Sequence, residues 1–280
     1  MKIKSVIIAA AVLIAVLSAW IAHGNQNIGL TTHETEVSGL PQAFEGLRIV
    51  QLSDLHNIVF KDGNAKLIAL VEQAEPDMIF ITGDMLDSRR TDTQAALRVA
   101  DKVVGIAPTY YVPGNHEARL AEYTEFEGSL EKLGVTVLRN SAVSVERDGE
   151  AISIVGVDDP DFALTYLDSG AEEAYMNTVL DGINQRGCTL LLSHRPELFE
   201  VYAEKGIALA FSGHVHGGQI RLPLLGGLYG PHQGFFPEYD GGLYHEDNSA
   251  MIVSRGIGNS IFPFRVNNDP EVVLAVLRCG

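Results

Sequence analysis

Five short apolar runs constrain the fold of this chain more than any other feature of its sequence. They are LRIVQL (47–52), MIFIT (78–82), TYYV (109–112), TLLLS (189–193) and LAFS (209–212). Continuous apolar runs of this length, bounded by turn residues, are typical of strands buried on both faces. Segments with helical spacing separate the early runs. This alternation predicts an α/β fold whose first sheet is largely parallel.

The helical segments between these runs have recognisable ends. Asn64 can cap one helix, and Asp92 can cap another that stops near Gly105. Pro196 suits the first turn of a third helix, for which Gly206 is the stop. These signals place the helices in the connections between strands.

The later parts of the chain add strands of a different kind. Residues 135–157 read as strand, turn and strand, with Asp148-Gly149 as a strong hairpin signal. The runs MIVS (251–254) and VVLAVL (272–277) are again strand-like. We therefore expect a two-sheet β-sandwich, packed face to face, with helices outside.

The N-terminus predicts a membrane anchor. Lys2 and Lys4 precede an apolar run from Val6 to Ala22 that only Ser18 interrupts. About 20 mainly apolar residues are enough to span a bilayer, and the lysines should stay cytoplasmic and place the rest outside. A cleaved signal peptide is the alternative. The expected organisation is an anchor or signal segment (1–25), a tether with an edge element (26–46) and a main domain (47–280).

Charge excludes one class of partner. The chain of 280 residues has 36 acidic and 20 basic residues and a net charge of −16, whereas nucleic-acid binding depends on clustered Lys and Arg. A protein of this charge that handles phosphates needs positive charge from another source. Cys188 and Cys279 could pair outside the cytoplasm or stay free, and the oligomeric state is left open.

Each of the five apolar runs is followed by residues that can bind a metal. The candidate ligands at these strand ends are Asp54, His56, Asp84, Asn115, His194, His214 and His216. Ligands in open α/β sheets bind outside the carboxyl ends of the strands, so these side chains are expected to converge. Each alone could be a helix cap, a turn residue or a core histidine. Together they predict a metal site.

The stretch GHVHGGQ (213–219) gives the site its most distinctive motif. In an extended segment the two histidines would point to the same face, and the flanking glycines would allow close approach of the main chain. Carboxylate, amide and imidazole ligands suit divalent Mn, Fe or Zn. Seven ligands are too many for one such ion and natural for two that share a carboxylate. Paired ions can clamp the attacking and leaving oxygens of an in-line displacement.

These motifs resemble the signature of the calcineurin-like metallophosphoesterases. The matching stretches are Asp54-Leu55-His56, Gly83-Asp84-Met85-Leu86-Asp87, Gly114-Asn115-His116-Glu117, His194 and Gly213-His214-Val215-His216. The resemblance runs from about Leu47 to the end and implies a β-sandwich with a two-metal centre. It implies one ion on Asp54, His56, Asp84 and His216, and a second on Asp84, Asn115, His194 and His214. Asp87 and Glu117 would orient ligands.

The resemblance also implies a function. The hydrophobic N-terminus makes the chain similar to the membrane-associated branch, whose members include enzymes that cleave lipid-linked phosphodiesters or pyrophosphates such as UDP-2,3-diacylglucosamine. The alternative is a nucleotide or phosphoprotein phosphatase, and the rival outside the enzymes is a membrane-tethered binding protein.

Further residues near the motifs have candidate roles in the reaction. His116 is outside the ligand set and is expected to assist the leaving group. Arg119 and Arg195 are candidates for binding phosphate, with surface arginines as the alternative. The segment 222–237 is either an apolar lip for an acyl chain or membrane, or a loop packed on the core.

Overall fold

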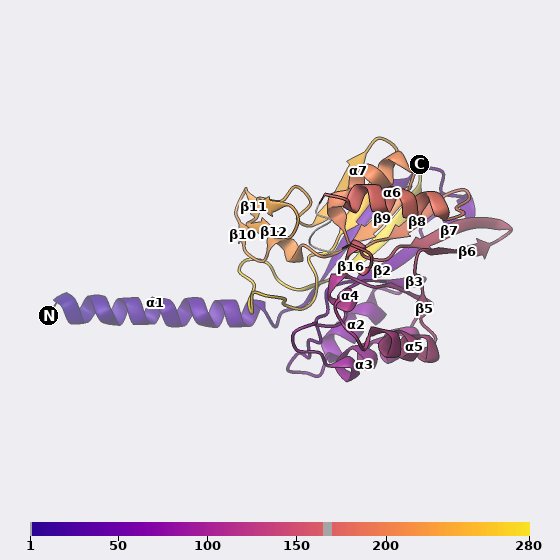
Figure 1. The fold of residues 1–280 in the computed structure, drawn as a ribbon. Coiled ribbons are helices and arrows are strands. Elements are labelled where there is room, and N and C mark those ends of the chain that lie inside the picture. Colours follow the sequence, from indigo (N-terminus) through magenta and orange to yellow (C-terminus); the bar gives the residue numbers. More distant parts are fainter. Residues whose placement is uncertain (1, 165–169) are drawn as a thin grey trace.

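The computed structural model describes residues 2–164 and 170–280. Figure 1 shows two sheets that face each other, with helices on both outer sides and one long helix that projects away from the domain. This arrangement of sheets and helices is the sandwich that the sequence predicts, and it places the carboxyl ends of the central strands along one edge.

The first sheet has six strands in the order β1-β16-β2-β3-β4-β5. Their bounds are Gly29–Val37 (β1), Glu271–Cys279 (β16), Arg48–Leu52 (β2), Met78–Thr82 (β3), Thr109–Val112 (β4) and Thr136–Val137 (β5). Only β16 and β2 pair antiparallel, and the other neighbours are parallel. The prediction of a largely parallel first sheet is confirmed.

The second sheet also has six strands, in the order β14-β15-β9-β8-β7-β6. Their bounds are Gly242–Glu246 (β14), Ser249–Val253 (β15), Leu209–Ser212 (β9), Thr189–Leu192 (β8), Glu150–Gly156 (β7) and Ser141–Arg147 (β6). The hairpin of β6 and β7 turns at Asp148 and Gly149, where φ is 52° and 82°. A two-residue turn of this kind needs positive φ at both positions, as the Asp-Gly pair predicts.

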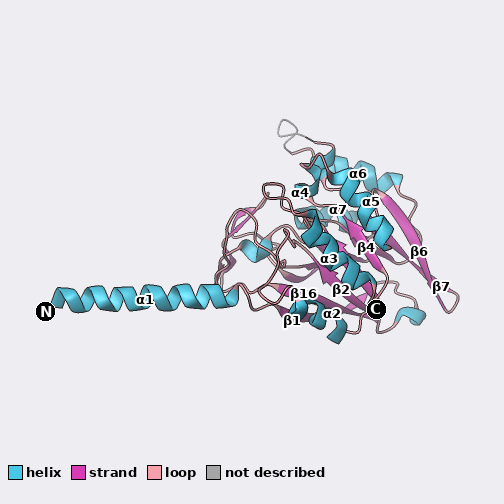
Figure 2. Ribbon diagram, turned by 90° about the horizontal axis from the view of Figure 1, so that it is seen from below, coloured by secondary structure: helices cyan, strands magenta, loops and turns pink. Residues whose placement is uncertain are grey.

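Helices cover the two outer faces of the sandwich (Figure 2). Those packed on the first sheet are α2 (Ala65–Gln73), α3 (Thr93–Val104) and α5 (Tyr123–Leu133). Those on the second are α6 (Glu172–Gly182) and α7 (Phe199–Glu204).

The loops contain shorter elements. The short helix α4 (Asn115–Ala118) follows β4. The 3-10 helices are η1 (Gln42–Phe44), η2 (Pro160–Phe162), η4 (Pro196–Leu198) and η5 (His216–Gly218). Two small hairpins pair β10 (Arg221–Leu222) with β11 (Gly226–Gly227) and β12 (Tyr229–Gly230) with β13 (Gly234–Phe235).

A continuous apolar core lies between the two sheets. Ile49 and Phe80 of the first sheet meet Leu190 and Phe211 of the second, and all four are fully buried. The rings of Phe80 and Phe211 pack edge to face with centroids 5.0 Å apart, a favourable aromatic geometry. This contact holds β3 against β9 and brings together the loops that follow them.

The helix signals read from the sequence are confirmed in part. The Asp92 carboxylate accepts the backbone N–H of Ala95 at 3.0 Å and caps α3, which ends at Gly105. Asn64 precedes α2 but does not cap it, because its left-handed backbone (φ 71°) turns the side chain back to accept the N–H of Phe60. The carboxylate of Asp62 caps α2 instead.

The helix α1 (Lys2–Gly24) leads directly into the sheet. Its segment Val6–Gly24 is long and apolar enough to cross a membrane. Within residues 26–46, β1 forms the edge of the first sheet and pairs with β16 along all nine of its residues. The expected edge element is therefore β1, and little of this segment is left as a free tether.

The two cysteines are free thiols. Cys188 is buried, and burial raises the pKa of its thiol to about 11. Cys279, at the end of β16, is partly exposed. Of the two arrangements left open by the sequence, the structure has the unpaired one.

Candidate active site

The candidate ligands converge where strands of both sheets end. Asp54 follows β2, Asp84 follows β3, and Asn115 follows β4, whereas His194 follows β8 and the GHVHGGQ stretch follows β9. All seven predicted ligands are at least nine-tenths buried: Asp54, His56, Asp84, Asn115, His194, His214 and His216. The structure therefore brings them together as expected.

Most of these residues adopt backbone conformations that are uncommon for side chains with a Cβ atom. The φ angle is positive at Asp54 (53°), His56 (46°), Asp84 (51°), His214 (74°) and His216 (52°). Such conformations are sparsely populated by residues other than glycine and persist where the surrounding structure holds them. Their concentration at one edge of the sandwich is a signature of a functional site.

The GHVHGGQ stretch reaches the site by a turn, and the expectation of an extended segment is wrong. Left-handed backbone at His214 and His216 directs the two rings to different neighbours. A Cβ on Gly213 would lie 1.9 Å from Ser53 Oγ and 2.5 Å from Asp54 Oδ2. Only glycine allows the chain to pass so close to that carboxylate.

One half of the site contains two imidazoles and two carboxylates. His56 Nε2 lies 3.1 Å from His216 Nε2 and 3.6 Å from Asp84 Oδ2. His216 Nε2 lies 3.4 Å from Asp54 Oδ1. Two nitrogens each about 2.0–2.1 Å from one ion lie about 3.0–3.4 Å apart. The spacing of these four groups suits ligands of one cation.

The other half shares Asp84. His194 Nε2 lies 3.2 Å from Asp84 Oδ2, the same oxygen that faces His56. The other nitrogen of His194 lies 2.7 Å from the carbonyl oxygen of Thr82. A carbonyl can only accept, so this nitrogen carries the proton and the lone pair of Nε2 points at the carboxylate.

Asn115 completes this half. The amide group lies 2.9 Å from His214 Nδ1 and 3.2–3.3 Å from the Arg119 guanidinium. With the NH2 group toward His214 and the oxygen toward Arg119, both contacts are hydrogen bonds. With the oxygen toward His214, the amide oxygen and Nδ1 face each other as acceptors unless Nδ1 is protonated, and a cation can lie between them. Asp84, His194 and His214 are spaced as ligands of one cation, and Asn115 lies beside them.

Electrostatics also favour bound cations. Burial raises the pKa of Asp54 to about 6, and burial lowers the pKa of His56 to about 3. Burial and neighbouring positive groups hold the pKa of His214 and that of His216 well below the usual value. Burial alone would lower the pKa of His194, but the negative charges of Asp84 and Asp54 have the larger effect and raise this pKa to about 10. Buried carboxylates need a positive charge, which the protonated ring of His194 supplies when no ion is bound and which divalent ions supply when they bind.

Glu117 supports the loop that carries Asp84. Its fully buried carboxylate accepts the backbone N–H groups of Asp84 (2.9 Å), Leu86 (2.8 Å) and Gly114 (2.8 Å). Asp87, the other residue expected to orient ligands, is bonded to Arg89 and lies 3.9 Å from His116 Nδ1. Glu117 therefore fixes the loop that carries Asp84, and Asp87 lies behind His116.

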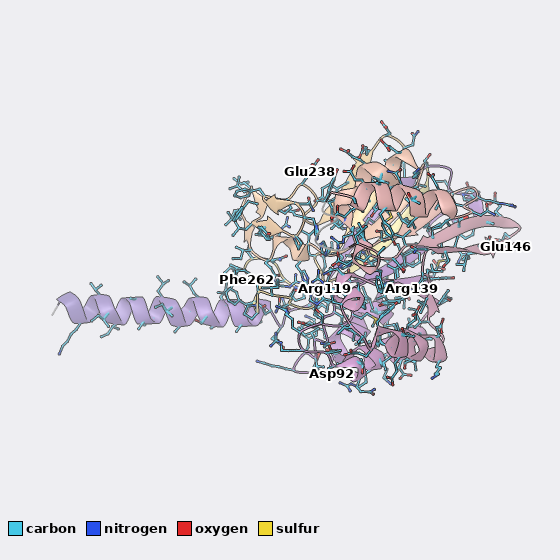
Figure 3. The ribbon with its side chains drawn as sticks, viewed as in Figure 1. Asp92, Arg119, Arg139, Glu146, Glu238 and Phe262 are labelled. Atoms are coloured by element: carbon cyan, nitrogen blue, oxygen red, sulfur yellow. The ribbon has the colours of Figure 1, made fainter. Side chains whose placement is uncertain are left out.

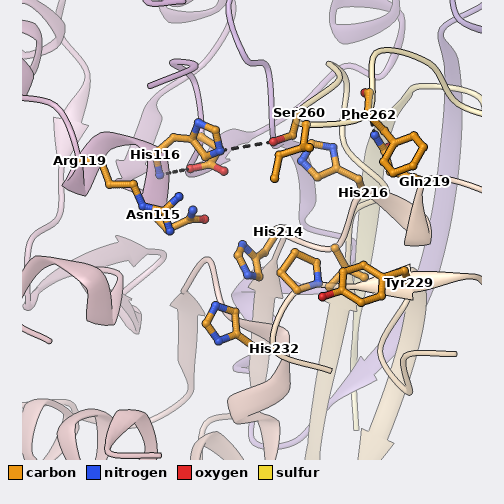
Figure 4. A pocket seen from close by; sticks show the side chains of 14 residues that line it. Asn115, His116, Arg119, His214, His216, Gln219, Tyr229, His232, Ser260 and Phe262 are labelled. Carbon is orange, nitrogen blue, oxygen red and sulfur yellow. Dashed lines mark hydrogen bonds between the residues drawn. The ribbon is translucent and has the colours of Figure 1, made fainter. Parts of the chain in front are cut away.

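His116 is held in one tautomer. Its Nδ1 accepts the backbone N–H of Ser88 at 3.0 Å, so in the neutral ring Nε2 carries the proton. That nitrogen lies 3.3 Å from Ser260 Oγ at the cleft (Figure 4). Burial lowers the pKa of His116. Because α4 begins at Asn115, the two neighbouring side chains diverge on a helical turn and not on the extended segment that the sequence suggested.

The two candidate arginines have different surroundings. Arg119 is partly exposed, lines the cleft and pairs with Asp161 at 2.7 Å. Arg195 is fully buried, and its guanidinium is held by Asp159, Asp161 and Glu197 at 2.5–3.3 Å. The expectation that Arg195 contacts phosphate is not favoured, since three carboxylates already occupy its donors.

A cleft of about 340 Å³ opens above the ligands (Figure 4). Its lining includes Tyr229 and His232 of the 222–237 segment, for which the sequence left open an apolar lip or a packed loop. It also includes residues that the sequence analysis missed, namely Gln219, Ser260, Ile261 and Phe262. The His232 ring lies 5.4 Å from the His214 ring. Gln219 ends the GHVHGGQ stretch but had no predicted role, and residues 260–262 belong to no motif because they lie on a loop distant in sequence.

A buried arginine was also missed. A guanidinium nitrogen of Arg265 lies 3.2 Å from Nδ1 of His216, and the same group donates to the carbonyl oxygens of Arg255 and Gly258. It places a fixed positive charge behind the His216 ring. Its separation of 49 residues from His216 hides the contact from sequence reasoning.

Comparisons with known proteins identify the family. The family model of calcineurin-like phosphoesterases matches residues 47–218. The phosphodiesterase YaeI of Escherichia coli is 30% identical over 82% of this chain and 82% of its own length. The uncharacterized metallophosphoesterase YkuE of Bacillus subtilis is 29% identical over 90% of this chain and 86% of its own length.

A vertebrate relative has an explicit link to membranes. The zebrafish (Danio rerio) transmembrane protein with metallophosphoesterase domain is 29% identical over 88% of this chain, which spans 56% of that protein. The family binds a dinuclear metal centre, and the groups of buried His and Asp described above fit one. The chain belongs to the calcineurin-like phosphoesterases and is a phosphoester hydrolase.

Proposed function

We propose that this protein uses two divalent ions to hydrolyse a phosphodiester or pyrophosphate of a lipid-linked substrate at a membrane. Asp54, His56 and His216 would hold one ion, and Asn115, His194 and His214 the other. Asp84 would bridge them. The observation that carries this assignment is that one oxygen, Asp84 Oδ2, faces both His56 and His194.

The pair of ions would supply Lewis acidity and a water of lowered pKa, as in other two-metal hydrolases. The mixed ligand set suits Mn, Zn or Fe. The protein's own contribution is positional. Glu117 keeps the Asp84 loop in place, and the His116 Nε2–H points into the cleft, where it would donate a hydrogen bond to the departing oxygen, or a proton when the ring is in its imidazolium form. Arg119, which follows α4 on the same wall as His116, would reach a phosphoryl oxygen in the cleft.

The walls of the cleft support a substrate with an apolar part. Val215, Tyr229, Ile261 and Phe262 line the same cavity as His116 and Arg119. Such a wall suits the apolar part of a lipid, and the nucleotides in the screen below test the alternative that a base stacks on Tyr229 or Phe262. The name of the E. coli relative, a phosphodiesterase, favours a diester over a monoester.

The positive charge at the start of α1 supports an orientation. Lys2 and Lys4 lie at the beginning of α1, before its apolar segment Val6–Gly24, and positive flanks remain cytoplasmic. The hydrolase domain would then lie outside the cytoplasm. Protease treatment of intact cells tests this orientation, since a domain protected together with cytoplasmic proteins would contradict it.

The deciding experiment is a metal-dependent substrate screen. Full-length protein in detergent is stripped with a chelator, reloaded with Mn, Zn or Fe, and its metal content is measured. Each form is assayed with bis(p-nitrophenyl) phosphate, with p-nitrophenyl phosphate, with nucleotides and with hexadecyl p-nitrophenyl phosphate. We expect two ions per chain and the highest kcat/KM with the hexadecyl diester. Full activity after demetallation, or a preference for monoesters, would contradict the proposal.

A further inference from the structure

The surface of the domain has one concentration of exposed apolar side chains. In the described part of the chain after α1, the exposed large apolar residues other than Val59 all lie on two segments. We call them the apolar rim: Leu224, Leu225, Tyr229, Phe235, Phe236, Ile261, Phe262 and Phe264. Leu224 is fully exposed (105%), and Ile261 and Phe235 are 78% and 72% exposed. Apolar side chains gathered in this way mark an interaction surface.

The apolar rim is fastened to the end of α1. Asn25 follows the helix directly, and its amide donates to the carbonyl oxygen of Arg265 at 2.9 Å. The side-chain oxygen of Asn25 accepts the backbone N–H of Arg265 (2.8 Å) and the amide of Asn259 (3.2 Å). These bonds fix both ends of the segment 259–265, which carries Ile261, Phe262 and Phe264, beside the last turn of α1.

The second segment of the rim is joined to the first. The Gln219 amide donates to the carbonyl oxygen of Phe262 at 3.1 Å, and Ile220 forms a parallel bridge with Val266. The hairpins β10–β11 and β12–β13 therefore move with the 259–265 segment. Figures 1 and 2 show these loops on the side from which α1 projects, and Figure 3 places Phe262 beside the end of that helix.

The position of the apolar rim beside the end of α1 indicates that a lipid bilayer covers the rim. The segment Val6–Gly24 is apolar enough to cross a bilayer, so its last turn, next to Trp20, lies at the membrane boundary. Side chains fastened beside that turn lie at the same depth. A second copy of the chain or a soluble protein would have to compete with a lipid surface that α1 already holds there.

We propose that the apolar rim is a bilayer-docking surface, inserted into the leaflet from which α1 emerges. Tyr229, Ile261 and Phe262 belong both to the rim and to the cleft lining. The cleft therefore opens at the lipid headgroups. A lipid phosphoester can enter sideways while its acyl chains stay in the membrane, and this last step rests on the proposed function.

The docking is tested by depth-dependent quenching, without any turnover. Full-length protein carrying Cys279→Ser is reconstituted into vesicles of phosphatidylcholine and phosphatidylglycerol. A fluorophore is attached at Leu224→Cys or Phe235→Cys, with Glu146→Cys as the control on the β6–β7 hairpin, far from α1 (Figure 3). We expect nitroxide lipids to quench the first two labels and not the third. Equal access of an aqueous quencher to all three labels, or energy transfer between copies in place of lipid quenching, overturns the proposal.

A second measurement links docking to substrate entry. The double variant Leu224→Glu/Leu225→Glu alters rim residues outside the cleft lining, and Ser144→Glu/Ala174→Glu adds the same charge at exposed sites elsewhere. We expect the first variant to lose about tenfold or more in hydrolysis of hexadecyl p-nitrophenyl phosphate in vesicles, an effect of about 1.4 kcal/mol. Its rate with water-soluble bis(p-nitrophenyl) phosphate should match that of the control. An equal loss with both esters contradicts entry through the rim. If the wild type cleaves neither ester, the proposed function fails while the quenching result still decides the docking.

Discussion

Asp84 Oδ2 and His194 Nε2 face each other at 3.2 Å in the fully buried centre of the site. The Thr82 carbonyl accepts a hydrogen bond from Nδ1–H of His194, so in the neutral ring the Nε2 lone pair faces the carboxylate. Such a contact is stable only when a positive charge lies between or on the two groups. The pair therefore gives a direct way to test the metal centre.

Replacing Asp84, the proposed bridge, should remove more metal than replacing Asp54, a proposed ligand of one ion. We expect Asp84→Asn to lose both ions, because its Oδ2 faces the two halves of the site, and Asp54→Asn to lose mainly one. Turnover should fall by at least about 10²–10³-fold in each. Metal content and kcat measured together test this, with exposed Asp101→Asn as the control. Retention of two ions by Asp84→Asn would show that Asp84 is not the bridge.

Replacing His116 should spare the metals and slow the reaction. We expect His116→Asn to keep two ions and to lose about 10²–10⁴-fold in turnover, as for loss of a general acid. The loss should be larger for alkyl esters, whose leaving oxygen needs a proton, than for nitrophenyl esters. A missing ion would make His116 a ligand, and equal slowing of both esters would give it a role in positioning phosphate.

Glu117 should matter for stability as well as for metal binding. The amide of Glu117→Gln has only one acceptor oxygen and must direct its NH2 group at a backbone donor, which leaves that donor unsatisfied at a cost of about 1–3 kcal/mol. We expect Tm to fall by about 2–4 °C per kcal/mol and metal affinity to fall about 10–100-fold. Calorimetry and metal titration measure both, with exposed Glu125→Gln on α5 unchanged. A variant with normal Tm would show that the three bonds are dispensable.

Two glycines should respond oppositely to alanine. In Gly213→Ala the new methyl group would lie 1.9 Å from Ser53 Oγ and must displace Asp54. We expect that variant to lose an ion and activity. Gly128 lies inside α5 with nothing within 4 Å of a Cβ, so Gly128→Ala should stabilise the fold by about 0.5–1 kcal/mol. Similar effects from both substitutions would mean that close approach at Gly213 is not required.

The two arginines near the site should separate into a substrate group and a structural group. Arg119→Ala is expected to raise KM for phosphoesters with little change in Tm, because Arg119 lies at the cleft surface. Arg195→Ala leaves buried Asp159 without its partner, and removing one member of a buried ion pair costs about 3–5 kcal/mol. Tm and KM measured on both variants show which arginine binds substrate and which stabilises the fold. A stable Arg195→Ala with raised KM would restore its candidate role in phosphate binding.

The strands, and the candidate ligands at their ends, could be predicted from the sequence because both depend on residues that are neighbours along the chain. Buried runs such as MIFIT and LAFS became β3 and β9, and the Asp-Gly pair became the β6–β7 turn. The side chains at the strand ends converged because parallel strands end at a common edge.

Other features depend on contacts between distant segments, and the sequence could not show them. The Arg265–His216 contact and the His232–His214 ring pair join separate loops. The burial of Arg195 depends on its ion pair with Asp159, which lies 36 residues earlier in the chain. Asn64 failed as a cap because its left-handed backbone depends on the loop before it.

The short connection between α1 and β1 has a consequence for the range of the enzyme. The helix ends at Gly24 and the strand begins at Gly29, while Asn25 is bonded to the 259–265 segment. This connection leaves little length over which the domain could swing or rise. With α1 in a membrane, as proposed, the active site would stay at one fixed height above it. Phosphates on long stalks, or in a facing membrane, would then lie out of reach, so the way the domain is attached would restrict its substrates.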